Sequence, residues 1–278
     1  MKGQDPYLIR DFVEDFDSIS EEFARRSRAL SERVRMRTDV PYGERPRETL
    51  DLLFPDNVAE GAPLHVFVHG GYWRSGEKEL YRLVAETPLS AGAVTAMVEY
   101  DLMPGQRLAT LVAQVRRALI WLQENAASFG ADPNRISVSG HSAGAHLSSY
   151  LAAIGTGETQ PKLPQIKAML LLSGIYDLKD IPDSFLRNEA AMTHEEAALW
   201  SPLSSTQLPG PHRIIAFGGD ETPPFLEQAA ALEEKLRASG QSTELLNVSS
   251  RNHMNVVLDL ADPASRLGKA LIECIRRS

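Results

Sequence analysis

The chain has 278 residues, of which 43% are hydrophobic and 24% are charged, and this composition is typical of a folded globular protein rather than a disordered or fibrous one. Its formal net charge of −8 argues against general binding to nucleic acids or anionic membranes, because phosphate groups are recognised mainly by lysine and arginine. The single cysteine, Cys274, excludes an intrachain disulfide and a metal site built from several thiolates. The sequence has no long apolar run and no signal-peptide pattern, which predicts a cytoplasmic protein.

The first predicted element is an amphipathic helix at residues 18–37. Its apolar residues recur at helical spacing: Ile19, Phe23, Leu30 and Val34. Ser18 and Glu21 have the spacing of a capping box, which is typical of a helix N-terminus. Arginines are frequent between residues 25 and 37, but acidic residues flank them, so we interpret them as a solvated face rather than an RNA-binding patch.

Beyond residue 41, short apolar runs alternate with longer helical patterns. The predicted strands are residues 49–54, 64–69, 93–100, 135–139, 166–173, 214–217 and 243–248. The predicted helices are residues 77–86, 107–128, 143–154, 224–238 and 264–276. This alternation predicts one α/β domain over residues 1–278, in which helices cover both faces of a mostly parallel sheet. Residues 174–211 form a long irregular stretch, which we predict to be a short cap segment.

A Gly-His-Ser-Ala-Gly pentapeptide occupies residues 140–144, between a predicted strand and a predicted helix. The pattern G-x-S-x-G at a strand-to-helix turn is typical of a nucleophilic serine, because the flanking glycines remove side chains that would clash with neighbouring backbone. The same pentapeptide without that context is often a simple turn. The context favours Ser142 as a nucleophile.

A His-Gly-Gly-Tyr-Trp segment follows another predicted strand and begins at His69. A glycine-rich loop at this position can supply backbone N–H groups to an oxyanion hole, and the residue after the nucleophile supplies another. The predicted donors are therefore Gly71, Tyr72 and Ala143. We interpret His69 as a residue that ties down the loop rather than one that performs chemistry.

Two other kinds of site fit the sequence poorly. Residues 71–78 nearly match a phosphate-binding loop, but Glu77 stands where that loop requires a lysine. A zinc-binding His-Glu-x-x-His pattern is also missing, since Ala198 follows His194 where the second histidine ligand would stand. A nucleotide-binding protein and a zinc hydrolase are therefore both disfavoured.

The remaining partners of a catalytic serine should follow it in the order acid, then histidine. His253 lies after the last predicted strand and is the predicted base. The strand at residues 214–217 is followed by Gly-Gly-Asp-Glu, which offers two neighbouring carboxylates. A G-x-x-E spacing from Gly218 selects Glu221 as the acid, with Asp220 as the alternative.

These motifs together resemble the kynurenine formamidase (arylformamidase) branch of the α/β-hydrolases, including its bacterial esterase-like members. The resemblance covers most of the chain, and its narrowest motifs are His-Gly-Gly-Tyr-Trp at residues 69–73 and Ser-Gly-Ile-Tyr-Asp-Leu at residues 173–178. It implies an α/β-hydrolase fold with Ser142 as nucleophile, His253 as base and Glu221 as acid. The animal enzymes have aspartate at the acid position, so the glutamate is a departure that weakens transfer of the substrate.

We therefore predict a serine hydrolase that needs no cofactor or metal. It would cleave a carboxylic ester or an aryl-formamide bond, as in N-formylkynurenine, through an acyl-enzyme. The predicted partners are a small-molecule substrate and a second copy in a homodimer. Tyr72 and Trp73 would contact an aromatic leaving group, with simple packing of the loop as the alternative. The competing hypothesis is a catalytically silent hydrolase fold that binds a ligand or a partner.

Overall fold

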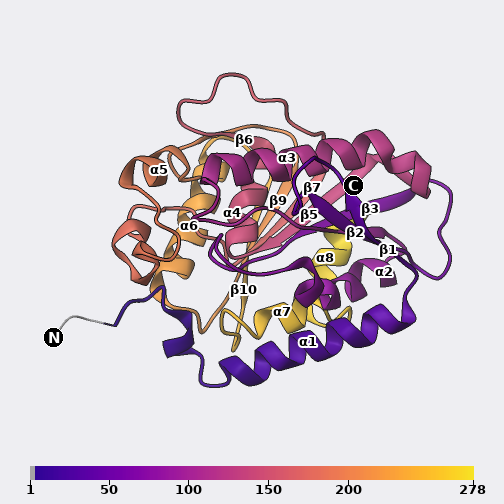
Figure 1. The fold of residues 1–278 in the computed structure, drawn as a ribbon, viewed down its shortest axis with the longest axis horizontal. Coiled ribbons are helices and arrows are strands. Elements are labelled where there is room, and N and C mark those ends of the chain that lie inside the picture. The colour runs from indigo at the N-terminus through magenta and orange to yellow at the C-terminus, as the bar shows by residue number, and fades with distance from the viewer. Residues whose placement is uncertain (1–3) are drawn as a thin grey trace.

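A computed structural model describes residues 4–278. The main sheet has eight strands in the order β1-β2-β4-β3-β5-β7-β9-β10 (Figure 1). The strands are β1 (Met36–Pro41), β2 (Thr49–Leu53), β3 (Ala62–Val68), β4 (Val94–Val98), β5 (Ala131–His141), β7 (Ala168–Leu172), β9 (His212–Gly218) and β10 (Thr243–Val248). Strand β2 pairs antiparallel with both β1 and β4, while the pairs from β4 to β10 are parallel.

Helices cover both faces of this sheet, as Figure 1 shows: α1, α2, α7 and α8 lie on one side, and α3, α4 and α6 on the other. Their bounds are α1 (Phe16–Arg33), α2 (Glu86–Ser90), α3 (Leu108–Asn125), α4 (Ala143–Ser149), α5 (His194–Leu199), α6 (Pro223–Ala238), α7 (Val256–Leu260) and α8 (Arg266–Arg276). None of the helices within residues 4–278 combines the length and apolarity needed to cross a membrane. This arrangement confirms the predicted fold class.

The central strands are buried on both faces, which explains their nearly continuous apolar sequences. Every residue of β7 and of β4 is buried, and β3 is buried over its last five positions. Parallel strands of this kind end at a common edge of the sheet, where the loops that follow them meet. The predicted site residues follow β3, β5, β9 and β10.

The N-terminal part of the chain differs from the prediction at both ends of its helix. Helix α1 begins after Asp15 rather than at the predicted capping box, and it ends at Arg33. Val34 is extended, and residues 36–41 form β1, an edge strand that pairs with β2. The helical spacing of apolar residues persists as far as Val34, so the sequence alone suggested a longer helix. Pairing with β2, which lies in a separate part of the chain, decides the outcome.

Two other predicted helices are shortened or replaced by tighter turns. Residues 78–85 form a 3₁₀ helix, η2 (Lys78–Ala85), which continues into α2. The helix predicted at residues 143–154 ends at Ser149 and is followed by the 3₁₀ turn η4 (Tyr150–Ala152) and the short strand β6 (Ala153–Ile154). The predicted strand at residues 64–69 is β3, which begins earlier, at Ala62.

The predicted cap segment at residues 174–211 is built from short elements. These are the 3₁₀ turns η5 (Ile181–Asp183) and η6 (Phe185–Arg187), helix α5 and strand β8 (Thr206–Gln207). Strand β8 pairs antiparallel with β6, which ties the end of the segment to the region after α4. Phe185 lines the cavity described below. The role of this segment as a cap stays a prediction.

Buried neutral histidines lead to a prediction about stability in acid. Burial lowers the pKa of His65 from 6.5 to about 3 and that of His146 to about 4. Between those values and 6.5 the unfolded chain binds more protons than the folded one, so the free energy of unfolding should fall as pH falls. We expect His65→Gln to reduce this slope by up to about 1.4 kcal/mol per pH unit.

Urea unfolding at several pH values from 7 down to 4 measures that slope. The matched control is His194→Gln, because the His194 side chain is 68% exposed and its replacement should leave the slope as in the parent chain. An unchanged slope in the His65 variant would show that His65 is not neutral in the folded protein.

Candidate active site

Ser142 occupies a sharp turn between β5, which ends at His141, and α4, which begins at Ala143. Its φ is 56° and its ψ is −120°, a strained conformation for a residue with a side chain. The Ser142 N–H donates to the Leu172 carbonyl oxygen at 2.8 Å, which fixes the turn against β7. The chain therefore holds the Ser142 side chain at the carboxyl end of a central strand.

Close backbone contacts explain the glycines on either side of Ser142. A Cβ atom on Gly144 would lie 2.1 Å from the Val68 carbonyl oxygen, and one on Gly140 would lie 2.5 Å from the Gly144 carbonyl oxygen. Both distances are far inside van der Waals contact. Only glycine allows α4 to begin this close to β3 and β5.

These contacts predict that Gly144→Ala destabilises the fold, because the clash is with backbone atoms that cannot rotate away. We expect the free energy of unfolding to fall by about 2 kcal/mol or more, as in overpacked cores. Gly105→Ala is the matched control, since its Cβ would meet only the Leu102 carbonyl oxygen, at an ordinary 3.4 Å. Thermal unfolding of the two variants tests this, and equal melting temperatures would contradict the expected clash.

Glu221, and not Asp220, lies beside His253. The Nδ1 atom of His253 is 2.7 Å from Glu221 Oε2. The other carboxylate oxygen, Oε1, accepts hydrogen bonds from Ser173 Oγ at 2.5 Å and from the Gly218 N–H at 2.6 Å. Asp220 is exposed to solvent. The structure thus brings together the acid and the histidine that the sequence preferred, and it adds Ser173, whose contact with Glu221 the sequence did not predict.

His253 is 4% exposed and is held from two further directions. The Phe225 ring lies 4.3 Å from the His253 ring, and the His141 ring lies 4.8 Å from it, centre to centre. His141 Nε2 donates to the His253 carbonyl oxygen at 2.9 Å. The resulting position of His253 is set by packing and by its own backbone as well as by Glu221.

Ser142 and His253 both line a cavity of about 440 Å³. In the part of the chain that the structure describes, no hydrogen bond joins Ser142 Oγ to the His253 ring, which instead bonds Glu221. In serine hydrolases such bonds are often long without substrate and shorten in the reacting complex. The two side chains are therefore neighbours in one cavity and are not bonded to each other.

The cavity wall includes residues that the sequence did not predict. Leu8, Ile9, Phe16 and Phe23 come from the N-terminal segment and α1, and Met254 follows His253. This segment is tied to the glycine-rich loop, since the Tyr72 hydroxyl donates to the Tyr7 carbonyl oxygen at 2.5 Å. A prediction of this part of the cavity wall from sequence could have started from the apolar residues in the otherwise polar N-terminal segment.

The loop after β3 passes directly beside Ser142. A Cβ on Gly70 would lie 3.2 Å from the Ser142 Cβ atom. Gly71 has a φ of 119°, and Tyr72 and Trp73 have φ values of 50° and 59°, which non-glycine residues rarely adopt. None of the hydrogen bonds formed among residues 4–278 uses the N–H of Gly71, Tyr72 or Ala143. Those three N–H groups remain available to a ligand.

The structure corrects the role predicted for Trp73. This residue is 0% exposed and does not line the cavity, so it cannot touch a substrate bound there. Its indole N–H donates to His146 Nδ1 at 3.1 Å, and the two rings meet edge to face with centres 5.1 Å apart. Trp73 packs the loop against α4, which is the alternative that the sequence left open. Tyr72, by contrast, does line the cavity.

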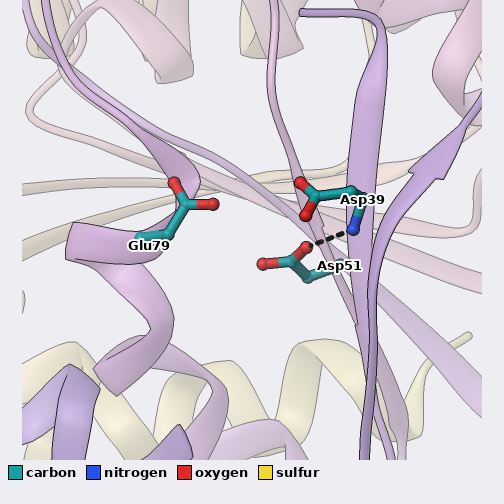
Figure 2. A group of neighbouring side chains, drawn as sticks. All are labelled: Asp39, Asp51 and Glu79. Atoms are coloured by element: carbon teal, nitrogen blue, oxygen red, sulfur yellow. Dashed lines mark hydrogen bonds between the residues drawn. The ribbon is translucent and has the colours of Figure 1, made fainter.

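A separate group of acidic side chains, Asp39, Asp51 and Glu79, is drawn in Figure 2. Their spacing would suit a cation. The ammonium group of Lys78 already lies 2.7 Å from Asp39, 3.2 Å from Asp51 and 2.5 Å from Glu79, and Arg82 pairs with Asp51 at 2.5 Å. This cluster is therefore a network of ion pairs that joins β1, β2 and η2.

Comparison with known proteins identifies the family. The BD-FAE family matches residues 50–236. Kynurenine formamidase of Danio rerio is 31% identical over 246 residues, which cover 86% of this chain and 82% of that protein. A probable isoprenylcysteine alpha-carbonyl methylesterase of Oryza sativa subsp. japonica is 28% identical over 243 residues, which cover 79% of this chain and 57% of that protein.

A solved structure agrees over nearly the whole chain. The crystal structure of a putative thioesterase from Silicibacter sp. tm1040 superposes with a TM-score of 0.81 at 28% sequence identity, and the match covers 99% of both chains. The family match, the kynurenine formamidase relative and this structural neighbour agree with the resemblance seen in the sequence motifs. The chain therefore belongs to the BD-FAE family and is a kynurenine formamidase-like α/β-hydrolase.

Proposed function

We propose that the protein is a serine hydrolase that cleaves a carboxylic ester or an aryl-formamide through an acyl-enzyme. Ser142 is the nucleophile, His253 the general base and Glu221 the acid that orients it. The observation that carries this proposal is the 2.7 Å contact between Glu221 and His253, whose ring lines the same cavity as Ser142. A ligand-binding fold without activity would not require this arrangement.

The contact between Glu221 and His253 supports the roles proposed for the three side chains. A carboxylate only accepts hydrogen bonds, so the Nδ1 atom of His253 carries a proton and its Nε2 atom is free to act as a base. When the Ser142 hydroxyl attacks a carbonyl carbon, its proton passes to that nitrogen. Glu221 then stabilises the imidazolium that forms.

The negative charge that develops on the carbonyl oxygen needs donors that are already in place. The N–H groups of Gly71, Tyr72 and Ala143 suit this role, because no group in the described part of the chain accepts from them. His253 next protonates the leaving alcohol or amine. Water then attacks the acyl-enzyme, with the same histidine as base, and releases the acid.

The cavity wall supports an aromatic substrate. Phe16, Phe23, Tyr72, Tyr81 and Phe185 line it together with Leu8 and Ile9, and rings of this kind pack well against another ring. The relatives are named for formamide and ester hydrolysis, which supports an N-formylkynurenine-like formamide or a small ester as substrate. We infer action on such a small molecule in the cytoplasm.

Labelling with a fluorophosphonate tests the mechanism. The probe should add once to the protein as measured by intact mass, and Ser142→Ala should take up none. Ser20→Ala is the matched control, because Ser20 also lines the cavity but does not lie on a strained turn, and it should be labelled normally. Absence of labelling in the parent chain would favour a silent fold.

A substrate panel then separates the two bond types. Formyl-anilides, short acyl esters of phenols and N-formylkynurenine should all be hydrolysed. Their kcat/KM values then show which of the two bond types the enzyme prefers. Hydrolysis of aliphatic esters alone would contradict the aromatic preference expected from the cavity wall.

A further inference from the structure

We propose that His69 is a positioning residue that works as a buried imidazolium cation. It holds the Gly70 carbonyl oxygen and thereby points the N–H of Gly71 at the reacting carbonyl. This inference rests on the proposed serine mechanism, in which that N–H binds the oxyanion. It assigns a charge and a task to a side chain that does not touch the substrate.

The ring of His69 lies between two hydrogen-bond acceptors. Its Nε2 atom is 3.0 Å from Glu99 Oε1, and its Nδ1 atom is 2.8 Å from the Gly70 carbonyl oxygen. The side chain is 0% exposed. A Cβ on Gly76 would lie 2.7 Å from Nδ1, which shows how closely the backbone covers this contact.

Neither neutral form of the imidazole satisfies both contacts. A neutral ring carries one N–H, and its second nitrogen presents a lone pair. With the proton on Nε2, the lone pair of Nδ1 would face the carbonyl oxygen of Gly70. With the proton on Nδ1, the lone pair of Nε2 would face the carboxylate of Glu99. Only the doubly protonated ring donates in both directions.

The surroundings of the ring can support this cation. Oε2 of Glu99 accepts a hydrogen bond from the Lys78 N–H, and Oε1 accepts from the Tyr100 N–H and the Arg47 guanidinium. These donors favour the carboxylate form of Glu99. Arg47 Nη2 lies 2.6 Å from Oε1, yet its side chain is 32% exposed and its charge is partly solvated. The rings of Tyr81 and Tyr100 stack on His69, and burial keeps both phenols neutral by raising their pKa values.

The link to the oxyanion hole is the geometry of a single peptide bond. In a planar trans peptide the carbonyl oxygen and the N–H point in opposite directions. Because His69 fixes the Gly70 carbonyl oxygen, the Gly71 N–H must point away from His69. Gly70 and Gly71 both line the cavity that contains Ser142. A hydrogen bond to the carbonyl also polarises the peptide and strengthens its N–H as a donor.

The protonation state can be read directly by ¹⁵N NMR of the histidine rings in the full chain. The signal that disappears in His69→Asn belongs to His69, and at pH 8 it should show both ring nitrogens protonated. Glu99→Gln removes the paired carboxylate and should convert the signal to that of a neutral ring. A neutral His69 at pH 8 in the parent chain would overturn the proposal whatever the activity of the enzyme.

The positioning role is tested by two conservative variants. The asparagine amide nitrogen reaches about as far as Nδ1, and that of glutamine about as far as Nε2. His69→Asn can therefore keep the bond to Gly70, whereas His69→Gln keeps only the bond to Glu99. We expect His69→Gln to lower kcat by about 10- to 100-fold, somewhat less than loss of an entire oxyanion donor. His69→Asn should stay within about fivefold of the parent kcat.

Both variants should leave KM within about twofold of the parent value, because His69 acts on the reacting oxygen rather than on substrate binding. Thermal unfolding checks that they are equally folded. Equal loss of kcat in the two variants, or a change confined to KM, would overturn the positioning role. Failure of the serine mechanism would appear separately, as full activity in Ser142→Ala.

Discussion

Replacing Ser142 with alanine is expected to lower kcat by about 10⁵–10⁶, the range seen when a serine hydrolase loses its nucleophile. The hydroxyl is the only part of the side chain that can form the acyl-enzyme. Alanine keeps the Cβ atom, and the Ser142 N–H still donates to the Leu172 carbonyl oxygen. The fold should therefore survive, and residual hydrolysis should come from the oxyanion hole and binding alone.

The matched control is Ser148→Ala, in the same helix. The Ser148 hydroxyl is buried and has no hydrogen-bond partner among residues 4–278, so its loss should leave both kcat and stability close to those of the parent. Steady-state kinetics on one activated phenyl ester, together with thermal unfolding, compares the two variants. A Ser142→Ala protein that retains a tenth of the parent kcat would refute the assignment of the nucleophile.

The second large effect is expected at Glu221. Glu221→Gln should lower kcat by about 10⁴, the cost of losing the acid that orients a catalytic histidine. An amide nitrogen cannot accept the Nδ1 proton of His253, and it also disturbs the bonds that Glu221 accepts from Ser173 and Gly218. His253 would lose both its tautomer and the charge that stabilises its protonated form.

Asp220→Asn is the control for this prediction, since Asp220 is the neighbouring carboxylate and is exposed. Its kcat/KM should change by less than about tenfold, which corresponds to about 1.4 kcal/mol. Both variants are measured on the same ester, with fluorophosphonate labelling to show that Ser142 is still in place. The reverse order of the two effects would move the acid to Asp220.

Local sequence patterns were sufficient for the centre of the molecule. The buried strands and the turn around Ser142 depend on short-range rules: apolar runs bounded by turns, and glycines where backbone segments approach closely. These rules identified the strands that carry the site and the loop at residues 69–73. They also selected Glu221, which lies beside His253 in the structure, because its spacing from Gly218 is a property of one turn.

Tertiary structure alone decided the features that join distant parts of the chain. The sequence extended α1 to residue 37, whereas hydrogen bonds to β2 convert residues 36–41 into an edge strand. The N-terminal wall of the cavity and the burial of Trp73 against His146 likewise depend on contacts across long stretches of sequence.

The environment of His69 shows the same division most clearly. The sequence marked it as a residue that ties down the glycine-rich loop, but its pairing with Glu99, which lies at the end of the neighbouring strand β4, follows from the order of strands in the sheet. Periodicity and motifs describe what each segment of chain can form by itself. Which side chains face one another across the sheet depends on how those segments pack, because burial and hydrogen bonding between segments outweigh local preference.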